Sequence, residues 1–165
     1  MLERYVYKNQ KKMRCGYTTG TCACAAAKAA AYMLLSGRKV KEIKVITPMG
    51  VSLTLPVMDI DIKEDKVICA IKKDSGDDPD VTNGIKIYAQ VTYVKEDIMR
   101  TINTDGVIVD GGIGVGRVTK KGLKCAVGEA AINPVPLKMI KEAVAEAAES
   151  YSYEGSLKVI ISAPK

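Results

Sequence analysis

The strongest constraint on the fold is the segment Arg14–Ala31, RCGYTTGTCACAAAKAAA, in which a turn rich in Thr and Gly leads into a run of alanines. This pattern predicts a helix over 21–36 that ends at Gly37. Because the alanine side chains are small, another element or a flat ligand can approach this helix closely. The first turn of a helix also presents backbone N–H groups without partners, which suits an anion. A well-capped helix buried by its alanines is the alternative. The hydroxyl residues at its start are Thr18, Thr19 and Thr21.

Strand patterns occupy most of the remaining chain. Runs of apolar and β-branched residues predict strands at 4–7, 42–47, 51–57, 67–71, 85–94, 107–109 and 157–163, with a further short strand and turn at 117–123. Asn133-Pro134 opens a second helix, and its apolar positions are expected to face the sheet: Ile140, Val144, Ala147 and Tyr151. Because several strands follow one another without strict βαβ alternation, we predict an α+β fold in one domain over 1–165. It would hold a mixed sheet of about five to seven strands, with two main helices packed mostly on one face.

The charge balance favours an anionic partner. The 165-residue chain has 25 basic and 19 acidic residues and a net charge of +6. The basic residues are scattered, and no basic stretch carries the interleaved aromatics that stack on bases, so we expect no nucleic-acid partner. No apolar run reaches membrane-spanning length and the N-terminus lacks a signal-peptide pattern, which predicts a cytoplasmic protein without a membrane partner. A homo-oligomer is left open.

Two residue types limit the chemistry. The chain contains no His, so a proton transfer would use Asp, Glu, Lys, Tyr or Cys, and Ser–His or Cys–His nucleophiles are excluded. The odd number of five cysteines argues for reduced thiols. Because Cys22-Ala-Cys24 lacks the C-x-x-C spacing, buried small residues are a better explanation than a zinc site.

An acidic loop, KDSGDDPDVTNG, separates two of the predicted strands. Mutual repulsion of its carboxylates is a cost that a simple surface turn has little reason to bear. The acidic residues of this loop do not have the spacing of the ligands in an EF-hand, which argues against a calcium loop. The remaining interpretations are a site for a ribose, an amine or a sulfonium, a site that positions a proton donor, and a solvated turn. The carboxylates fall within seven residues: Asp74, Asp77, Asp78 and Asp80.

Two further loops have a polar, glycine-rich character. Asp110–Gly116, DGGIGVG, follows a predicted strand, but it lacks the full G-x-G-x-x-G fingerprint of dinucleotide sites. Close approach of its backbone to some ligand is still expected. GEAAINPVP places Glu129 and Asn133 before the second helix, where an anion or simple capping would both suit them. Four such loops in one small domain predict a shared polar pocket beside the alanine helix, and hence an enzyme or a ligand-binding protein.

Three long segments, RCGYTTGTCACAAAKAA, KKDSGDDPDVTNG and GGIGVGRVTKKGL with GEAAINPVPLKMI, together resemble the CbiD family, the cobalt-precorrin-5B C1-methyltransferases of anaerobic cobalamin biosynthesis. The resemblance implies methyl transfer from S-adenosylmethionine to ring carbon C1 of cobalt-precorrin-5B, giving cobalt-precorrin-6A. It also implies a tetrapyrrole substrate, with cobalt as part of that substrate and no protein-bound metal. Only the N-terminal part of the family is covered, so its C-terminal half is expected to be absent from this chain.

The resemblance assigns roles by position. The implied catalytic residues are Asp77 and Asp78, and the implied donor-binding residues are Asp80, Thr82, Gly112 and Gly114. Candidates for the substrate, several of them cations suited to its carboxylates, are Arg14, Thr18, Thr19, Thr21, Lys28, Arg117, Glu129, Asn133 and Lys138. Asn83 stands where many members of the family have His.

Other functions stay open at this stage. One is a methyltransferase acting on a related tetrapyrrole. Another is a non-catalytic module that binds a corrinoid or a nucleotide and needs the missing half for turnover. A basic nucleic-acid binder is the third, and it predicts an affinity that falls steeply with salt.

Overall fold

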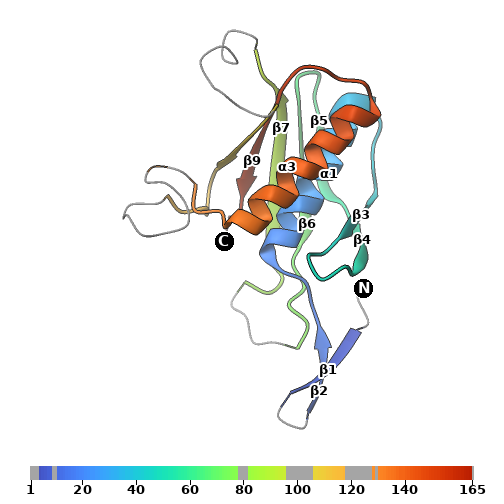
Figure 1. Cartoon of the computed structure of the whole chain (residues 1–165), viewed down its shortest axis with the longest axis vertical. Coiled ribbons are helices and arrows are strands. Elements are labelled where there is room, and N and C mark those ends of the chain that lie inside the picture. Colours follow the sequence, from blue (N-terminus) through green and yellow to red (C-terminus); the bar gives the residue numbers. More distant parts are fainter. Residues whose placement is uncertain are drawn as a thin grey trace.

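Two long helices cover one face of a mixed five-stranded sheet (Figure 1). The computed structural model describes residues 4–8, 11–77, 82–95, 106–117, 128 and 130–164. The helices are α1 (Thr19–Ser36) and α3 (Pro134–Ser150). The sheet runs in the order β5 (Met58–Ile62), β6 (Lys66–Lys72), β7 (Lys86–Tyr93), β9 (Leu157–Ser162) and β8 (Val107–Gly111). Neighbouring strands are antiparallel except β8 and β9, which are parallel. The predicted α+β class, the mixed sheet and the one-sided placement of the helices are confirmed.

Two antiparallel hairpins accompany this sheet. The first pairs β3 (Glu42–Ile46) with β4 (Ser52–Pro56), as predicted, and its alternate residues are buried beside α1. The second pairs β1 (Arg4–Lys8) with β2 (Lys11–Cys15) and stands away from the body of the molecule (Figure 1). Strands β2 and β5 were not among the predicted ones. The predicted strand at 117–123 is described only at Arg117, which forms an isolated bridge with Ala130.

Helix α1 is the centre of the core. Thr18 is its N-cap, and Gly37 ends it in the left-handed conformation with φ 70° while its N–H donates to the Met33 carbonyl at 2.9 Å. The alanines let neighbours approach its backbone on two sides. The Cys69 thiol, on β6, donates to the Ala26 carbonyl at 3.2 Å, and a Cβ added to Gly20 would lie 2.7 Å from Pro136 Cγ on α3. The sheet and α3 are therefore both in close contact with this one helix.

Helix α3 buries one face, as the spacing of its apolar residues predicts, but this face packs mainly on α1 rather than on the sheet. Ile140, Val144 and Ala147 are fully buried, and the helix packs mainly on α1 and then on β8. The prediction that Tyr151 faces the sheet is wrong. Tyr151 is the C-cap residue and is 46% exposed, and its ring lies edge-on to the ring of Tyr32, with 6.0 Å between the centroids. The helical spacing extends the face one turn too far because the helix ends at Ser150.

The cysteines that the structure describes fit the prediction of reduced, buried residues. Cys22, Cys24 and Cys69 are free, and burial raises the pKa of their thiols to about 12, 11 and 12. The side chain of Cys15 and the whole of Cys125 lie outside the described residues. The three described thiols are therefore packing groups that stay protonated at neutral pH.

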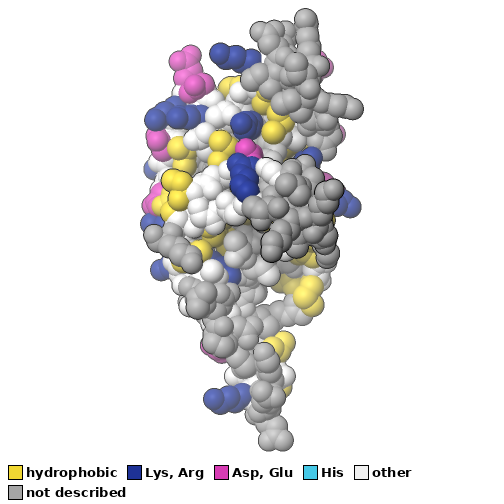
Figure 2. Space-filling model, turned by 90° about the vertical axis from the view of Figure 1, so that its left-hand side faces the viewer, with side chains coloured by type: hydrophobic (Ala, Val, Ile, Leu, Met, Phe, Trp, Pro, Cys, Tyr) yellow, Lys and Arg dark blue, Asp and Glu magenta, His cyan; other side chains and the backbone are white. Residues whose placement is uncertain are grey.

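The described surface is mixed in character. Figure 2 shows basic, acidic and hydrophobic side chains interspersed over the face that it presents, and the β1–β2 hairpin forms the narrow projection at its lower end. Over the described residues, no helix is long and apolar enough to cross a membrane.

Candidate functional site

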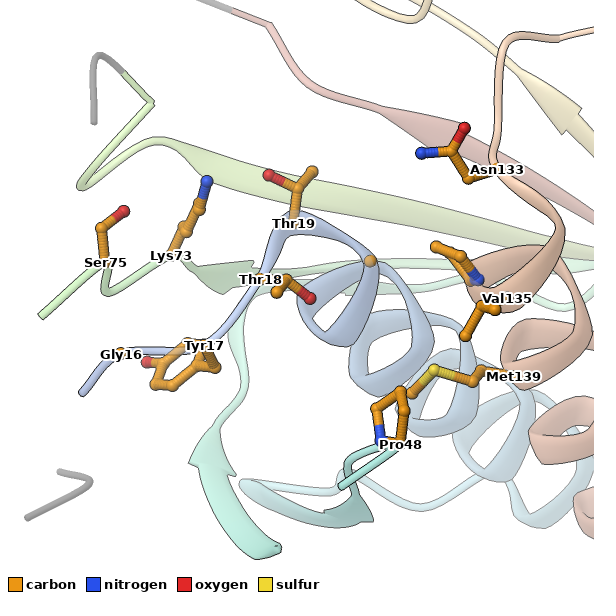
Figure 3. Close-up of a pocket in the computed structure, with 12 residues that line it drawn as sticks. Gly16, Tyr17, Thr18, Thr19, Pro48, Lys73, Ser75, Asn133, Val135 and Met139 are labelled. Atoms are coloured by element: carbon orange, nitrogen blue, oxygen red, sulfur yellow. The ribbon is translucent and has the colours of Figure 1, made fainter. Parts of the chain in front are cut away.

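A cleft of about 570 Å³ opens at the N-terminal end of α1 (Figure 3). Three segments that are far apart in the sequence form it: the turn at 16–20, the loop after β6 at 73–75, and the start of α3 at 133–139. Pro48, from the turn between β3 and β4, adds to its wall. Three of the four polar loops that the sequence singles out therefore meet at one place, beside the alanine helix.

The turn at 16–20 is fixed to the loop that follows β6. A Cβ on Gly16 would overlap backbone atoms of Asp74, Ser75 and Gly76, so only glycine allows this approach. The Tyr17 N–H donates to the Asp74 carbonyl at 2.8 Å, and the Tyr17 hydroxyl donates to the Lys72 carbonyl at 3.2 Å. These contacts hold the first wall of the cleft against the second.

The threonines at the start of α1 divide into two roles. Thr18 Oγ1 accepts the Thr21 N–H at 3.1 Å and donates to Thr21 Oγ1 at 3.1 Å, which caps the helix. Thr21 is 2% exposed and does not line the cleft. Thr18 and Thr19 do line it, and Figure 3 shows them at the helix entry. This end of α1 carries the positive end of the helix dipole, which favours an anion.

Lys73 is the charged residue of the cleft wall, and the sequence analysis did not single it out. It follows β6, is 7% exposed, and its Nζ donates to Thr82 Oγ1 at 2.5 Å. Its backbone is held in place because its N–H donates to the Ile85 carbonyl and its carbonyl accepts the Gly84 N–H, both at 2.9 Å. Its side chain and the N-terminal end of α1 therefore bring hydrogen-bond donors to the same part of the cleft. The available signal was a lysine placed directly between a predicted strand and a polar loop.

Other residues of the acidic loop shape the loop itself. The Asp74 carboxylate accepts the Gly76 N–H at 2.9 Å, and Asn83 Oδ1 accepts the Ser75 N–H at 2.9 Å. Asp77 is exposed and is not among the residues that line the cleft. Asp78 and Asp80 lie outside the described residues, so their predicted roles stay predictions.

The third wall is mainly apolar. Asn133 is the N-cap residue of α3, as predicted, but its side chain makes no capping hydrogen bond and it lines the cleft instead. Val135, Pro136 and Met139 continue this wall along the first turns of α3. Figure 3 shows Met139 and Pro48 on the same side of the cleft. A ligand here would meet a polar, positive side and an apolar side.

Two of the candidate cations, Lys28 and Lys138, do not line the cleft. Lys28 Nζ donates to the Lys44 carbonyl at 2.8 Å, on β3, and lies about 15 Å along α1 from the N-cap. The Lys138 side chain is 78% exposed, and its Nζ lies 3.8 Å from Glu142 Oε1. Arg14 belongs to β2, with its side chain outside the described part, and Glu129 is not described. Their predicted roles stay predictions.

The glycine-rich loop at 110–116 lies outside the cleft. A Cβ on Gly112 would overlap the Ser162 hydroxyl, and a Cβ on Gly114, which has φ 80°, would overlap the Ala163 carbonyl. Close packing on the end of β9 thus explains why glycine stands at these two positions, and their predicted role in donor binding stays a prediction. Arg117 is tied to this loop, since it pairs with Asp110 and donates to the Gly111 carbonyl at 3.1 Å. The hydrogen bond from Arg117 holds the pKa of the Asp110 carboxyl below its usual value.

A second cleft of about 510 Å³ lies on the other side of Tyr17 and Lys73, which line both. Its other walls come from the end of β4, the start of β5 and the turn at 83–84. Among the described residues, no group of three or more acidic or thiol side chains could hold a metal ion. The described lining of the first cleft also includes no carboxylate or thiol. This arrangement suits the binding and orientation of an anionic ligand.

Comparison with known proteins gives consistent matches along the chain. The model of the CbiD family matches residues 6–165. A protein of Ruminiclostridium cellulolyticum named cobalt-precorrin-5B C(1)-methyltransferase is 50% identical over 162 residues, which cover 98% of this chain and 40% of that protein. A protein of the same name from Picrophilus torridus is 46% identical over 151 residues, covering 92% of this chain and 42% of the relative.

A solved structure also matches. The crystal structure of a cobalamin biosynthesis protein, CbiD, from Archaeoglobus fulgidus aligns with a TM-score of 0.62 and 30% identity, over 95% of this chain and 46% of that one. The chain therefore spans about two fifths of the length of the curated relatives that it matches.

Proposed function

Because the chain belongs to the CbiD family, we propose that it takes part in transferring a methyl group from S-adenosylmethionine to ring carbon C1 of cobalt-precorrin-5B. The observation that carries this proposal is the 50% identity over 98% of the chain with a relative named for that methylation. The chain spans only 40% of that relative, so we also propose, and do not take from the relative's name, that this chain contributes to the methylation. We place the reaction in the cytoplasm, where both ligands would be available.

The chemistry asks little of the protein beyond alignment. An electron pair at C1 of the macrocycle attacks the methyl carbon, the S–CH₃ bond breaks, and the sulfonium leaves as the neutral thioether S-adenosylhomocysteine. The methyl group is already electrophilic, so a protein nucleophile is not required. The contribution of the protein is to hold the two reactants in line and close together. The described lining of the cleft supports this role, because it offers hydrogen-bond donors on one side and apolar side chains on the other.

We assign the positive side of the cleft to a ligand carboxylate. Thr19, the first-turn N–H groups of α1 and the Lys73 ammonium group can each donate to such an anion. Val135 and Met139 offer apolar contact to the body of the same ligand. Both ligands of the proposed reaction carry carboxylates, so this assignment fits either one. Asp77, Asp78 and Asp80 remain candidates for contact with the sulfonium or the amino group of the donor.

A second candidate function is a binding module that needs the rest of the family protein for turnover. The described cleft lining favours it, because hydrogen-bond donors and apolar side chains are the features of a binding site. The two functions differ in one assay. The chain would be incubated with cobalt-precorrin-5B and methyl-labelled S-adenosylmethionine, alone and with the remaining part of the R. cellulolyticum relative.

Labelled macrocycle from the chain alone would support catalysis by this part, and label only in the mixture would support the binding module. No label in either sample, while the full-length relative methylates the substrate, would contradict the proposed function.

A further inference from the structure

The β1–β2 hairpin has an unusual composition for a segment that stands in solvent. Its ten strand residues, RYVYK and KKMRC, include five basic residues and no acidic one. Tyr7 is 79% exposed, Val6 48% and Tyr5 45%, so three large side chains face water. Each strand of the hairpin packs chiefly on the other. An isolated two-stranded hairpin is marginally stable on its own, so exposed tyrosines on one indicate a partner.

Strand pairing sorts these residues into two faces. Successive side chains of a strand point to opposite sides, so Tyr5 and Tyr7 share one face and Val6 lies on the other. The ladder pairs Tyr7 with Lys12, and the Lys12 ammonium group lies 4.4 Å from the centroid of the Tyr5 ring. Lys12 therefore belongs to the tyrosine face. The basic residues are scattered along the sequence, but the hairpin brings a cation and two aromatic rings together.

The hairpin rises from the rim of the cleft. Strand β2 ends at Cys15, and the next two residues, Gly16 and Tyr17, line the cleft. The close approach of Gly16 to Asp74 and the hydrogen bond from the Tyr17 N–H fix the base of the hairpin to the cleft wall. Figure 1 shows the hairpin extending from the N-terminal end of α1. A ligand larger than the cleft would have this hairpin within reach.

We propose that the tyrosine face of the hairpin, formed by Tyr5, Tyr7 and Lys12, is a second contact surface for the tetrapyrrole substrate. This inference rests on the proposed function, which supplies a flat macrocycle with carboxylates on its rim. The tyrosine rings stack on the macrocycle, and Lys12 donates to a peripheral carboxylate. The five basic residues of the hairpin match the charge of such a ligand. The donor lacks such a macrocycle, so its binding should not depend on this face.

The test uses cobyrinic acid, a cobalt corrin with free carboxylates, as the probe and this chain as the protein. Binding is followed by absorbance titration for the wild type and for a Tyr5→Ala/Tyr7→Ala variant, with Val6→Ala on the opposite face as the matched control. We expect about tenfold weaker binding for the double variant, a change within about twofold for Val6→Ala, and retained binding for Tyr5→Phe/Tyr7→Phe. Lys12→Gln should weaken binding by about threefold at low salt, and exposed Lys41 gives the control, Lys41→Gln.

Further measurements separate the outcomes. S-adenosylhomocysteine binding by calorimetry should be equal in all variants, and circular dichroism confirms that each is folded. Wild-type affinity for cobyrinic acid in the double variant, or no binding by the wild type, would overturn the inference. So would binding of a short DNA duplex that depends on Tyr5 and Tyr7 in place of the corrin. If corrin binding depends on the tyrosines but neither sample of the methylation assay is labelled, the proposed function is contradicted and the hairpin surface is not. If methyl transfer occurs but corrin binding does not depend on the tyrosines, the hairpin surface alone is contradicted.

Discussion

Replacing Gly16 by Ala tests whether the hairpin base and the loop after β6 are joined as the structure shows. The new Cβ would overlap backbone atoms of three consecutive residues, which cannot move aside as a flexible side chain can. Overpacking of this kind costs about 1–3 kcal/mol, and loss of the hydrogen bond from the Tyr17 N–H to Asp74 costs about 1 kcal/mol more. The lower entropy of the unfolded alanine variant returns up to about 1 kcal/mol. The net expected loss is about 1–4 kcal/mol in the free energy of unfolding.

For a domain of this size, that loss lowers the midpoint of thermal unfolding by roughly 2–16 °C. The assay is thermal unfolding followed by circular dichroism, with urea unfolding to obtain the free energy. Gly116→Ala is the matched control, because a Cβ there would lie at an ordinary 3.9 Å from Ala131 and the residue does not have a positive φ. A Gly16→Ala variant that melts at or above the temperature of the Gly116→Ala variant would refute the described contact between residues 16 and 74–76.

Three other predictions concern the cleft, the buried thiols and α3. Lys73→Met should weaken the binding of S-adenosylhomocysteine or of cobyrinic acid, each measured by calorimetry, by about tenfold or more, whereas Lys66→Met, at the far end of β6, should change the binding of both less than twofold. The buried thiols resist ionisation, with pKa values raised to about 11–12, while the unfolded thiols ionise near pH 9.0. The contribution of these thiols to the free energy of unfolding is therefore fully present below pH 9. Above pH 9 it falls by about 1.4 kcal/mol per pH unit for each thiol. Urea unfolding of the wild type and of Cys69→Ala between pH 8 and about 10.5 should show a shallower fall of this free energy in the variant. Ile140→Ala should cost about 2–5 kcal/mol in urea unfolding, and an equal loss in Tyr151→Ala would contradict the described end of the buried face.

Strong local signals made the helices and most strands predictable. The threonine cap before α1 and the glycine after it act within a few residues, so the helix was predicted to within two residues of its observed start. Strand β5, MDIDI, alternates apolar and acidic residues but was not predicted: Asp is uncommon in strands, and Asp59 adopts φ 51° where the pairing shifts. Strand β2, KKMRC, is mostly charged, and its pairing with β1 is what defines it.

The position of the cleft was predicted from the sequence, but one residue that lines it, Lys73, was not. The convergence of the threonine turn, the loop after β6 and the start of α3 follows from chemistry that the sequence displays. The burial of Lys73 does not, because it depends on how the turn at 82–84 and residues 16–18 pack around it. Glycines at 112 and 114 read equally well as ligand contacts or as packing positions. Only their proximity to β9, about fifty residues further along the chain, distinguishes the two.

The central claim is that residues 18–20, 73–75 and 133–139 form one ligand site at the N-terminal end of α1. Amide chemical shifts of the isotope-labelled chain, recorded while S-adenosylhomocysteine and then cobyrinic acid are added, test it most directly. We expect the amides of all three segments to shift together, with one affinity, for at least one of these ligands. Shifts confined to a single segment, or centred on the glycine-rich loop at 110–116, would contradict it.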